Sequence, residues 1–221
     1  MKREQLFARI PAPHASKYGI GANDILRIPA SPDLVSDLLD CLRSDDELDL
    51  IFALMFAEHL RTRPDFCRLA EPSLPVLAAG IRSALAHSIP RVRASAIRAF
   101  VAYRSCFGDY STVIRSFLSD TDSQIRSEAL VAAPTFLATS ELAVLLPFRD
   151  DPEASETGGM GGPLRYLTRD LALSIAERIA GQQFSAGDCF ERVDGSSVSW
   201  RSWSTFTQWL DSKKRWSFLG V

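Results

Sequence analysis

Two stretches of this 221-residue chain repeat one sequence pattern, and that repetition limits the folds open to it. Residues 90–97 and 122–130 each carry an aliphatic residue followed by an arginine and, three positions later, an alanine. The two arginines, Arg93 and Arg126, stand 33 positions apart. A period of that length is typical of repeats made of two helices. One such pair cannot bury its apolar face alone, so the pattern predicts helix pairs stacked on one another.

Weaker copies of the pattern lie on either side. Residues 168–173 keep the arginine, Arg169, whereas residues 46–54 have Leu50 where the arginine is expected. The spacing to these outer copies is longer, and residues 61–72 and 150–163 are the insertions that account for it. Apolar residues at helical spacing predict helices over 34–42, from 45–47 to about Pro64, and over 74–87, 92–103, 110–118, 125–137, 141–148 and 164–179.

The Asp-x-x-(Ile/Val)-Arg-x-x-Ala-Leu pattern that opens each second helix resembles that of the HEAT-repeat family of α-solenoids. The resemblance covers about residues 31–180 and implies an all-α fold, a right-handed α-solenoid of about four HEAT-like helix pairs. Residues 1–30 are rich in proline and glycine and are expected to form an irregular N-terminal wrap. Residues 181–221 hold all four tryptophans and are expected to cap the C-terminal end, because an open solenoid end must hide its apolar face.

Composition excludes several classes of protein. Hydrophobic residues make up 46% of the chain, too many for a disordered protein. The formal net charge is -2, so the chain as a whole is not a basic nucleic-acid binder. The sequence shows no signal peptide and no apolar run long enough to span a membrane, which favours a cytoplasmic location. No two of the cysteines form a C-x-x-C pair, and all are expected to be buried free thiols: Cys41, Cys67, Cys106 and Cys189.

No catalytic motif emerges from the residues. The chain has three histidines, and the spacing of a zinc site is missing. HEAT-like di-iron hydroxylases carry repeated His-Glu pairs, whereas this chain has only Glu58-His59, in the reverse order. The glycine-rich segment 158–162 is followed by Pro163 rather than by the Gly-Lys-Ser/Thr of a phosphate-binding loop. We therefore predict no catalytic residue, no metal, no cofactor and no enzymatic activity.

The expected partner is another protein. The second helix of each pair builds the extended concave surface of a solenoid. On these helices the pattern predicts the outward residues Arg91, Ser95, Arg98, Gln124, Glu128, Val131 and Thr135. The glycine-rich loop 150–163 adds Gly159 and Met160 as a segment that orders on a partner. Arg165 and Arg169, one turn apart at the start of the following helix, are expected to assist that loop.

The resemblance favours a non-catalytic protein-binding module, a stand-alone inhibitor or adaptor. Small bacterial HEAT-like proteins of this kind include immunity proteins that neutralise a toxin domain. Two alternatives stay open: a scaffold subunit of a larger assembly, and a HEAT-like alkylpurine DNA glycosylase or other DNA-binding protein.

The DNA-binding alternative would use a basic concave face made by Arg91, Arg93, Arg98, Arg104 and Arg115. The position of Arg93 in the repeat weighs against DNA binding, because an arginine at that position is predicted to form a structural ion pair with a neighbouring aspartate. Nucleic acid and membrane are therefore not the expected partners, and the oligomeric state is left open.

Overall fold

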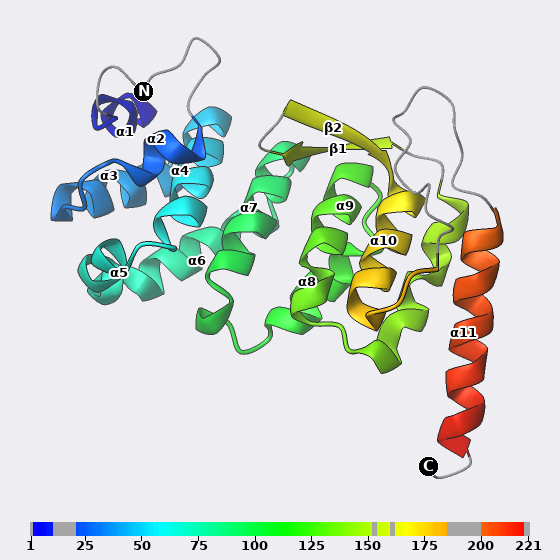
Figure 1. Ribbon diagram of the computed structural model, residues 1–221. Coiled ribbons are helices and arrows are strands. Elements are labelled where there is room, and N and C mark those ends of the chain that lie inside the picture. The colour runs from blue at the N-terminus through cyan, green and yellow to red at the C-terminus, as the bar shows by residue number, and fades with distance from the viewer. Residues whose placement is uncertain (1, 11–20, 152–153, 160–161, 185–199, 219–221) are drawn as a thin grey trace. The chain divides into compact units, whose positions relative to one another are not determined.

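A computed structural model of the chain describes residues 2–10, 21–151, 154–159, 162–184 and 200–218. The chain forms two compact units, Met1–Tyr110 and Ser111–Val221. Helices dominate both units, and the only strands among the described residues form one two-stranded sheet (Figure 1). The predicted all-α class is therefore confirmed, with that sheet as an addition. No helix in the described part of the chain combines the length and the apolar character that crossing a bilayer requires.

The first unit contains nine helical segments among its described residues. They are α1 (Arg3–Ala8), α2 (Ala22–Leu26), α3 (Pro32–Leu42), α4 (Glu47–Leu60), α5 (Pro64–Ala70), the 3-10 helix η1 (Glu71–Ser73), α6 (Leu74–Leu85), α7 (Pro90–Ala102) and the 3-10 helix η2 (Arg104–Cys106). Some of these elements fall where the sequence predicted irregular chain. The N-terminal wrap contains α1 and α2, and the insertion 61–72 folds largely into α5.

Local sequence sets where these helices begin. Pro32, Pro64 and Pro90 each occupy a first helical position, where proline loses no hydrogen bond and its fixed φ suits the helix. Ser31 caps α3, because its hydroxyl oxygen accepts the backbone N–H of Leu34 at 3.2 Å. Asp46 caps α4 in the same way by accepting the N–H of Asp49 at 3.0 Å.

Two helix pairs pack together in the first unit. α3 packs against α4 and α6 against α7 within each pair, while α3 contacts α6 and α4 contacts α7 between them. The core of this arrangement is aliphatic and sealed from solvent, with Leu38, Leu54, Ile81 and Ile97 each 0% exposed. Burial of such side chains contributes about 1.5–3 kcal/mol each, so contact between the pairs is what stabilises them.

The cysteines differ in exposure. Cys41, Cys67 and Cys106 are free thiols, of which Cys41 is buried as predicted and Cys67 is only half-buried. Burial raises the pKa of Cys41 to about 11. Cys106, however, lies on η2 and is exposed, so the prediction of a buried thiol was wrong for it. Cys189 lies outside the described residues.

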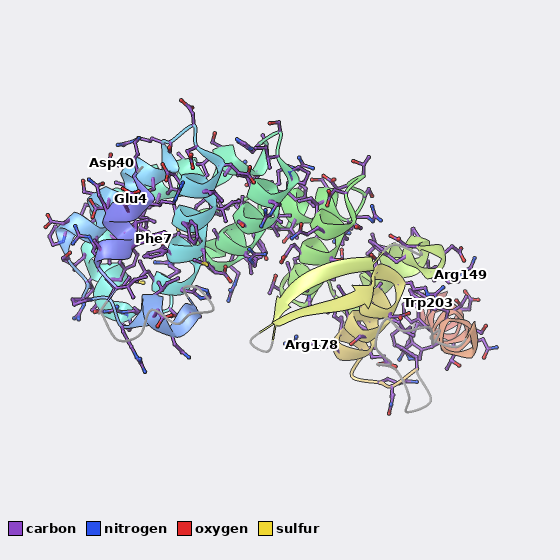
Figure 2. The ribbon with its side chains drawn as sticks, turned by 90° about the horizontal axis from the view of Figure 1, so that it is seen from above. Glu4, Phe7, Asp40, Arg149, Arg178 and Trp203 are labelled. Atoms are coloured by element: carbon purple, nitrogen blue, oxygen red, sulfur yellow. The ribbon has the colours of Figure 1, made fainter. Side chains whose placement is uncertain are left out.

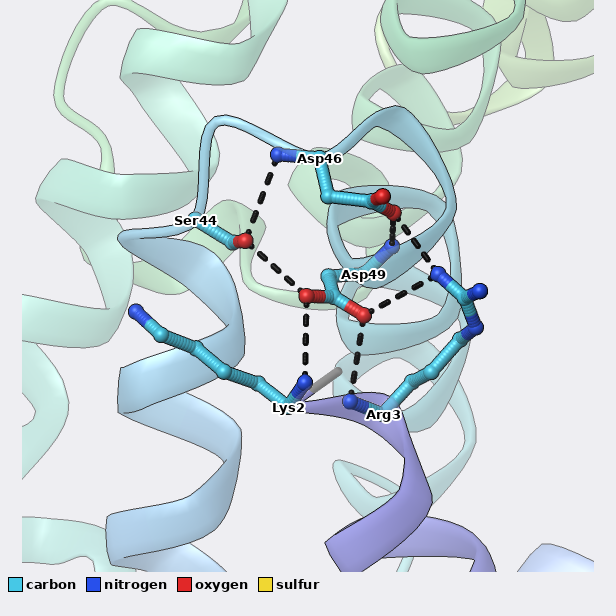
Figure 3. A network of polar contacts seen from close by, with 5 residues as sticks. All are labelled: Lys2, Arg3, Ser44, Asp46 and Asp49. Atoms are coloured by element: carbon cyan, nitrogen blue, oxygen red, sulfur yellow. Dashed lines mark hydrogen bonds and ion pairs between the residues drawn. The ribbon is translucent and has the colours of Figure 1, made fainter.

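Helix α1 is held against α3 and α4 by both apolar and polar contacts. The ring of Phe7, labelled in Figure 2, meets the ring of Phe52 edge-on, with centroids 4.6 Å apart. At the other end of α1, the carboxylate of Asp49 accepts the backbone N–H groups of Lys2 and Arg3 at 3.2 and 3.1 Å (Figure 3). The guanidinium of Arg3 also binds that carboxylate, at 3.2 Å, and the carboxylate of Asp46, at 2.7 Å.

Asp49 is the centre of this network and is only 2% exposed. The hydroxyl of Ser44 donates a further hydrogen bond to it at 2.9 Å. Burial alone would raise the pKa of Asp49, but the hydrogen bonds from Arg3, Ser44 and Lys2 outweigh burial and hold the pKa below its ordinary value. The ionised carboxylate therefore stabilises the folded state.

We expect Asp49→Asn to lower the free energy of unfolding by about 3 kcal/mol, because an amide presents one acceptor and two hydrogens to a set of donors. Denaturant titration at pH 7 measures this loss. Because the folded pKa is lowered, the contribution is complete above the unfolded pKa and disappears as pH falls. The difference between wild type and variant should therefore shrink below about pH 4.

Asp40→Asn is the matched control for that experiment. The Asp40 side chain is 53% exposed and meets the exposed Arg43 at 3.6 Å, so the change should cost less than about 0.5 kcal/mol. Equal stabilities for the two variants would contradict the role assigned to Asp49.

The second unit begins within α8 and ends with a long helix. Its elements are α8 (Tyr110–Phe117), α9 (Ser123–Ala132), the 3-10 helices η3 (Ala133–Thr135) and η4 (Thr139–Asp150), β1 (Ala154–Gly159), β2 (Gly162–Leu167), α10 (Thr168–Ala180) and α11 (Trp200–Phe218). α10 packs against η4, α9 and α11, and α11 also contacts η4. The predicted helix 141–148 is thus a 3-10 helix, and Pro147 within it has no N–H to donate to an α-helical ladder.

The insertion 150–163 does not form the predicted loop throughout. β1 and β2 pair antiparallel, with Ala154 opposite Leu167 and Gly159 opposite Gly162. The helix predicted from Leu164 therefore begins only at Thr168. Glycines disfavour a helix by about 1 kcal/mol each and proline by about 3, so the segment from Gly158 to Pro163 resists helix formation while a hairpin accommodates it.

Gly181 ends α10 in the left-handed conformation, with φ at 63°. The N–H of Gln182 then donates to the carbonyl of Glu177 at 3.2 Å, which closes the helix in a Schellman arrangement. No atom lies within 4 Å of the place where a Cβ on Gly181 would stand. A substitution there is therefore opposed by the backbone conformation alone.

Gly181→Ala should lower the free energy of unfolding by about 1 kcal/mol, measured by denaturant titration. Gly108 is the control, because the place where its Cβ would stand is equally open but its φ is not positive. Gly108→Ala should leave stability unchanged or raise it slightly, and a loss equal to that of Gly181→Ala would contradict the argument from φ.

Candidate functional site

The arginine of each clear repeat holds the turn that precedes its own helix. In the first unit, one terminal nitrogen of Arg93 donates to the backbone carbonyls of His87 and Ser88, both at 3.1 Å. In the second unit, the same nitrogen of Arg126 donates to the carbonyls of Asp120 and Thr121, at 2.9 and 3.0 Å. The acceptors lie six and five residues before the arginine in both copies.

A second hydrogen bond repeats in the same two turns. The N–H of Ile89 donates to the Nδ1 of His87 at 3.2 Å, and the N–H of Asp122 donates to the carboxylate of Asp120 at 2.9 Å. His87 and Asp120 thus play one role at equivalent positions, although they share neither size nor charge. The repeat seen in the sequence is therefore also a repeat of backbone geometry.

Arg126 makes one further contact, an ion pair of the kind that the sequence predicted for Arg93, whereas the hydrogen bonds described above for Arg93 go to backbone carbonyls. Its Nε and second terminal nitrogen meet the carboxylate of Asp151 at 3.0 and 2.8 Å, and both side chains are largely buried. A single guanidinium thus connects the turn before α9 to the residue that follows η4.

Arg126→Lys should lower the free energy of unfolding by about 2 kcal/mol, because one ammonium cannot reach two carbonyls and a carboxylate at once. Denaturant titration followed by far-UV circular dichroism measures this, and hydrogen exchange should show faster exchange in residues 120–126. Arg178→Lys, at an exposed position on α10, is the control and should change neither quantity. Unchanged stability and unchanged exchange in the Arg126→Lys variant would rule out the anchoring role.

The predicted binding residues on α7 do not all face solvent. Arg91 is exposed, as predicted. Ser95 is only 4% exposed, so the prediction that it points outward was wrong. Arg98 is half-buried, and its guanidinium meets the Ser95 hydroxyl at 3.1 Å and the carboxylate of Glu58 on α4 at 3.5 Å. The reason is that α7 packs against α4 as well as α6, which covers a second side of the helix.

The residues on α9 follow the same pattern. Gln124 is half-exposed, Val131 is 47% exposed and Thr135, just beyond in η3, is exposed. Glu128 is only 5% exposed, so it was wrongly predicted to point outward. Glu128 stands 33 positions after Ser95, and α9 likewise packs against two neighbours, α10 and β1. The wrong predictions for Ser95 and Glu128 therefore have the same cause, which is that each helix packs against two neighbouring elements.

The residues predicted around the glycine-rich loop are not brought together as expected. Gly159 ends β1, and Met160 lies outside the described residues. Arg165 belongs to β2, so it does not share a helical turn with Arg169, which lies in α10. Arg169 meets its neighbour Asp170 at 3.4 Å. Burial raises the pKa of Asp170, and Arg169 offsets only part of that rise.

A pocket that sequence reasoning missed lies between η4 and α11. It has a volume of about 260 Å³ and is lined by Arg149, Trp203, Ser204, Thr207 and Gln208. Figure 2 shows Arg149 and Trp203 next to each other on these two elements. The two walls of the pocket are more than 50 positions apart in sequence, so no local motif marks it. The sequence signal for this pocket was the group of tryptophans, which the sequence analysis assigned only to a C-terminal cap.

Trp203 is fixed within an aromatic cluster. Its ring meets Phe206 edge-on at a centroid distance of 5.7 Å, and Phe206 lies 5.1 Å from Phe184 and 6.3 Å from Trp209. Trp203 is 3% exposed, and its indole nitrogen finds no hydrogen-bond acceptor in the part of the chain that the structure describes. A buried donor of this kind normally has a partner.

The opposite wall of the pocket carries a positive charge. The Nε and one terminal nitrogen of Arg149 bind the carboxylate of Asp150, at 3.2 and 2.9 Å. That hydrogen bond raises the pKa of Arg149 and lowers the pKa of Asp150, so both groups stay ionised near neutral pH. The pocket is therefore lined by a guanidinium that Asp150 already pairs, by Trp203 and by the polar residues Ser204, Thr207 and Gln208.

Comparisons with known proteins add no relative. No family model matches the chain, and neither the curated proteins nor the solved structures contain a match. The described residues also hold no group of three or more His, Cys, Asp or Glu side chains able to bind a metal ion. The resemblance to HEAT repeats therefore rests on the sequence pattern alone.

Proposed function

We propose that this chain is a non-catalytic protein-binding module, a right-handed α-solenoid of about four HEAT-like helix pairs that acts as a stand-alone inhibitor or adaptor in the cytoplasm. The observation that carries the proposal is the pair of matched turns at Arg93 and Arg126. Repeated helix pairs generate extended surfaces on which other proteins bind. Such a surface needs no catalytic group.

The exposed residues of the second helices support a protein partner. On α9 and η3, the half-exposed Gln124, the aliphatic Val131 and the hydroxyl-bearing Thr135 offer a mixed polar and apolar strip. Protein-binding surfaces have this composition, with an apolar centre and a polar rim. On α7, Arg91 adds an exposed cation in the first unit.

The charges weigh against the DNA-binding alternative. Arg98 pairs with Glu58 at 3.5 Å, Arg115 pairs with Glu141 at 2.5 Å, and Arg93 binds backbone carbonyls. Among the described residues, only Arg91 and Arg104 of the five arginines considered keep a side chain with no such partner. DNA binding draws on several phosphate contacts, which two separated cations do not supply.

An immunity protein that neutralises a toxin domain is the form of this function that we favour, and a scaffold subunit of a larger assembly is the alternative within the same class. The two differ in a property of the partner. A toxin arrests growth when it is expressed alone, and co-expression of its inhibitor restores growth. A scaffold partner is not toxic and stays bound to further subunits.

Affinity capture with the full tagged chain from a lysate of its source tests the proposal. We expect one protein in stoichiometric amount, with saturable binding when that protein is purified. The double variant Val131→Glu/Thr135→Glu should weaken the purified complex at least about tenfold, because it places two charges in an apolar contact. Arg91→Glu tests the first unit in the same way.

Arg178→Glu serves as the control, since Arg178 is exposed on α10 and belongs to neither proposed surface. It should leave affinity unchanged. Recovery of nucleic acid instead of protein would contradict the proposal and lead to a base-excision assay on alkylated DNA. A complex insensitive to all of these variants would exclude the α7 and α9 surfaces.

A further inference from the structure

Arg61 is a half-buried cation that no carboxylate balances among the residues that the structure describes. It follows α4, and its terminal nitrogens contact the Sγ of Cys67 on α5 at 3.5 Å and the hydroxyl of Ser105 on η2 at 3.4 Å. A charge taken partly out of water normally gains an opposite charge in return. The arginines of this unit that do pair with a carboxylate are Arg3, Arg9, Arg43, Arg63, Arg82 and Arg98.

The ring of Tyr103 helps to hold this guanidinium in position. Its central carbon, Cζ, lies over the ring, 5.0 Å from the centroid, and Tyr103 itself is 0% exposed. The ring attracts the cation but carries no net charge. A guanidinium has five N–H donors, and the contacts with Cys67 and Ser105 leave some of them for another acceptor. Arg61 is therefore held in place with its charge still available to an anion.

Two further arginines stand on the elements that Arg61 contacts. Arg68 follows Cys67 in α5, and Arg104 precedes Ser105 in η2. Both are exposed, and within the described part of the chain neither forms an ion pair with a carboxylate. We call Arg61, Arg68 and Arg104 the basic strip. Three separate elements contribute to it, so no local sequence motif marks it.

The acids near the basic strip in sequence do not neutralise it. Asp65 pairs with Arg63, and Asp109 pairs with Arg82. Glu71, three positions after Arg68, is exposed and forms no ion pair with any described residue. The strip therefore keeps a positive charge, which attracts an anionic partner and speeds its association.

Two features of the surroundings favour an acidic polypeptide over a nucleic acid. Leu69, next to Arg68 on α5, is 41% exposed, and an aliphatic side chain suits an apolar residue of a partner better than a phosphate. The exposed Asp45 lies just before α4, whose 14 residues span about 21 Å, so the opposite end of this helix from Arg61 is acidic. A long polyanion would be repelled there, whereas a short acidic segment needs to contact the strip only.

We propose that the basic strip is a docking surface for a short acidic segment of a partner protein. One carboxylate of that segment binds Arg61, further carboxylates meet Arg68 and Arg104, and an apolar side chain lies against Leu69. This inference rests on the proposed function in taking the partner to be a protein. It adds the chemistry of that partner and a surface separate from those on α7 and α9.

Fluorescence anisotropy of a labelled peptide tests the strip before any partner is known. The probe is a fluorescein-labelled peptide of sequence Glu-Leu-Asp-Glu-Leu-Asp-Glu, and the control peptide replaces each Glu by Gln and each Asp by Asn. The full chain should bind the acidic peptide saturably and should not bind the neutral one. Raising the salt from about 50 mM to about 500 mM should weaken binding at least about fivefold, because salt screens exposed charges.

The double variant Arg68→Gln/Arg104→Gln should weaken binding of the acidic peptide at least about tenfold, because it removes two cations of the strip. Neither side chain holds another described group in place, so this variant should fold as the wild type does. The matched control is Arg43→Gln/Arg178→Gln, which removes the same charge from exposed positions on other elements and should leave the affinity unchanged. Arg61→Gln removes the central cation and should weaken binding by a factor similar to that of the first double variant.

Three results with the peptides would overturn the proposal. The first is equal binding of the acidic and the neutral peptide, or no binding of either. The second is an equal loss of affinity in the two double variants, which would make the effect one of net charge alone. The third is displacement of the acidic peptide by a single-stranded oligonucleotide at a lower concentration than by unlabelled peptide, which would assign the strip to nucleic acid.

Failure of the strip and failure of the proposed function can be told apart. A purified protein partner whose affinity and salt dependence Arg68→Gln/Arg104→Gln leaves unchanged would overturn the strip and leave the proposed function intact. Binding of the acidic peptide without capture of any protein would contradict the proposed function and support the preference of the strip for acidic chains.

Discussion

The guanidinium that binds two carbonyls of the preceding turn is the interaction on which the helix pairs of this chain depend. Backbone carbonyls in the turn between two helices have no partner within either helix, and leaving a half-buried one unsatisfied costs about 1–3 kcal/mol. Arg93 and Arg126 satisfy two such carbonyls each, and an arginine stays charged at any physiological pH. The turn is therefore held in one shape while the residues around it vary, as His87 and Asp120 show.

A fixed turn also fixes which sides of the following helix are covered. Position 91 is exposed and its counterpart 124 is half-buried, while position 98 is half-buried and its counterpart 131 is exposed. Only positions 95 and 128 are buried in both copies, although one holds serine and the other glutamate. In both copies a neighbouring element therefore covers the same position of the helix. This shared burial explains why the predictions that Ser95 and Glu128 point outward failed together.

Features that neighbouring residues determine, such as helix limits, can be predicted from this sequence. Contacts between residues far apart in the chain cannot. The repeat, the order of the helices and most of their limits follow from caps, prolines and apolar spacing, as at Ser31, Pro90 and Asp122. A second packing face made of small and polar residues leaves no apolar stripe, so Ser95 was assigned to solvent. The pairing of β1 with β2 joins residues that no helical or loop signal separates in the sequence, and the glycines of this segment indicate a loop equally well. The pocket joins Arg149 to Trp203 across a long stretch of chain.

The unpaired indole N–H of Trp203 shows how packing can outweigh a missing hydrogen bond. Burying a tryptophan removes about 150–250 Å² from water, which contributes about 4–6 kcal/mol at about 25 cal/mol per Å². An unsatisfied N–H costs about 1–3 kcal/mol. Packing against Phe206 therefore outweighs the missing hydrogen bond, and the second unit does not need an acceptor for this N–H in order to fold. For the same reason phenylalanine at this position keeps most of the packing and loses only the donor.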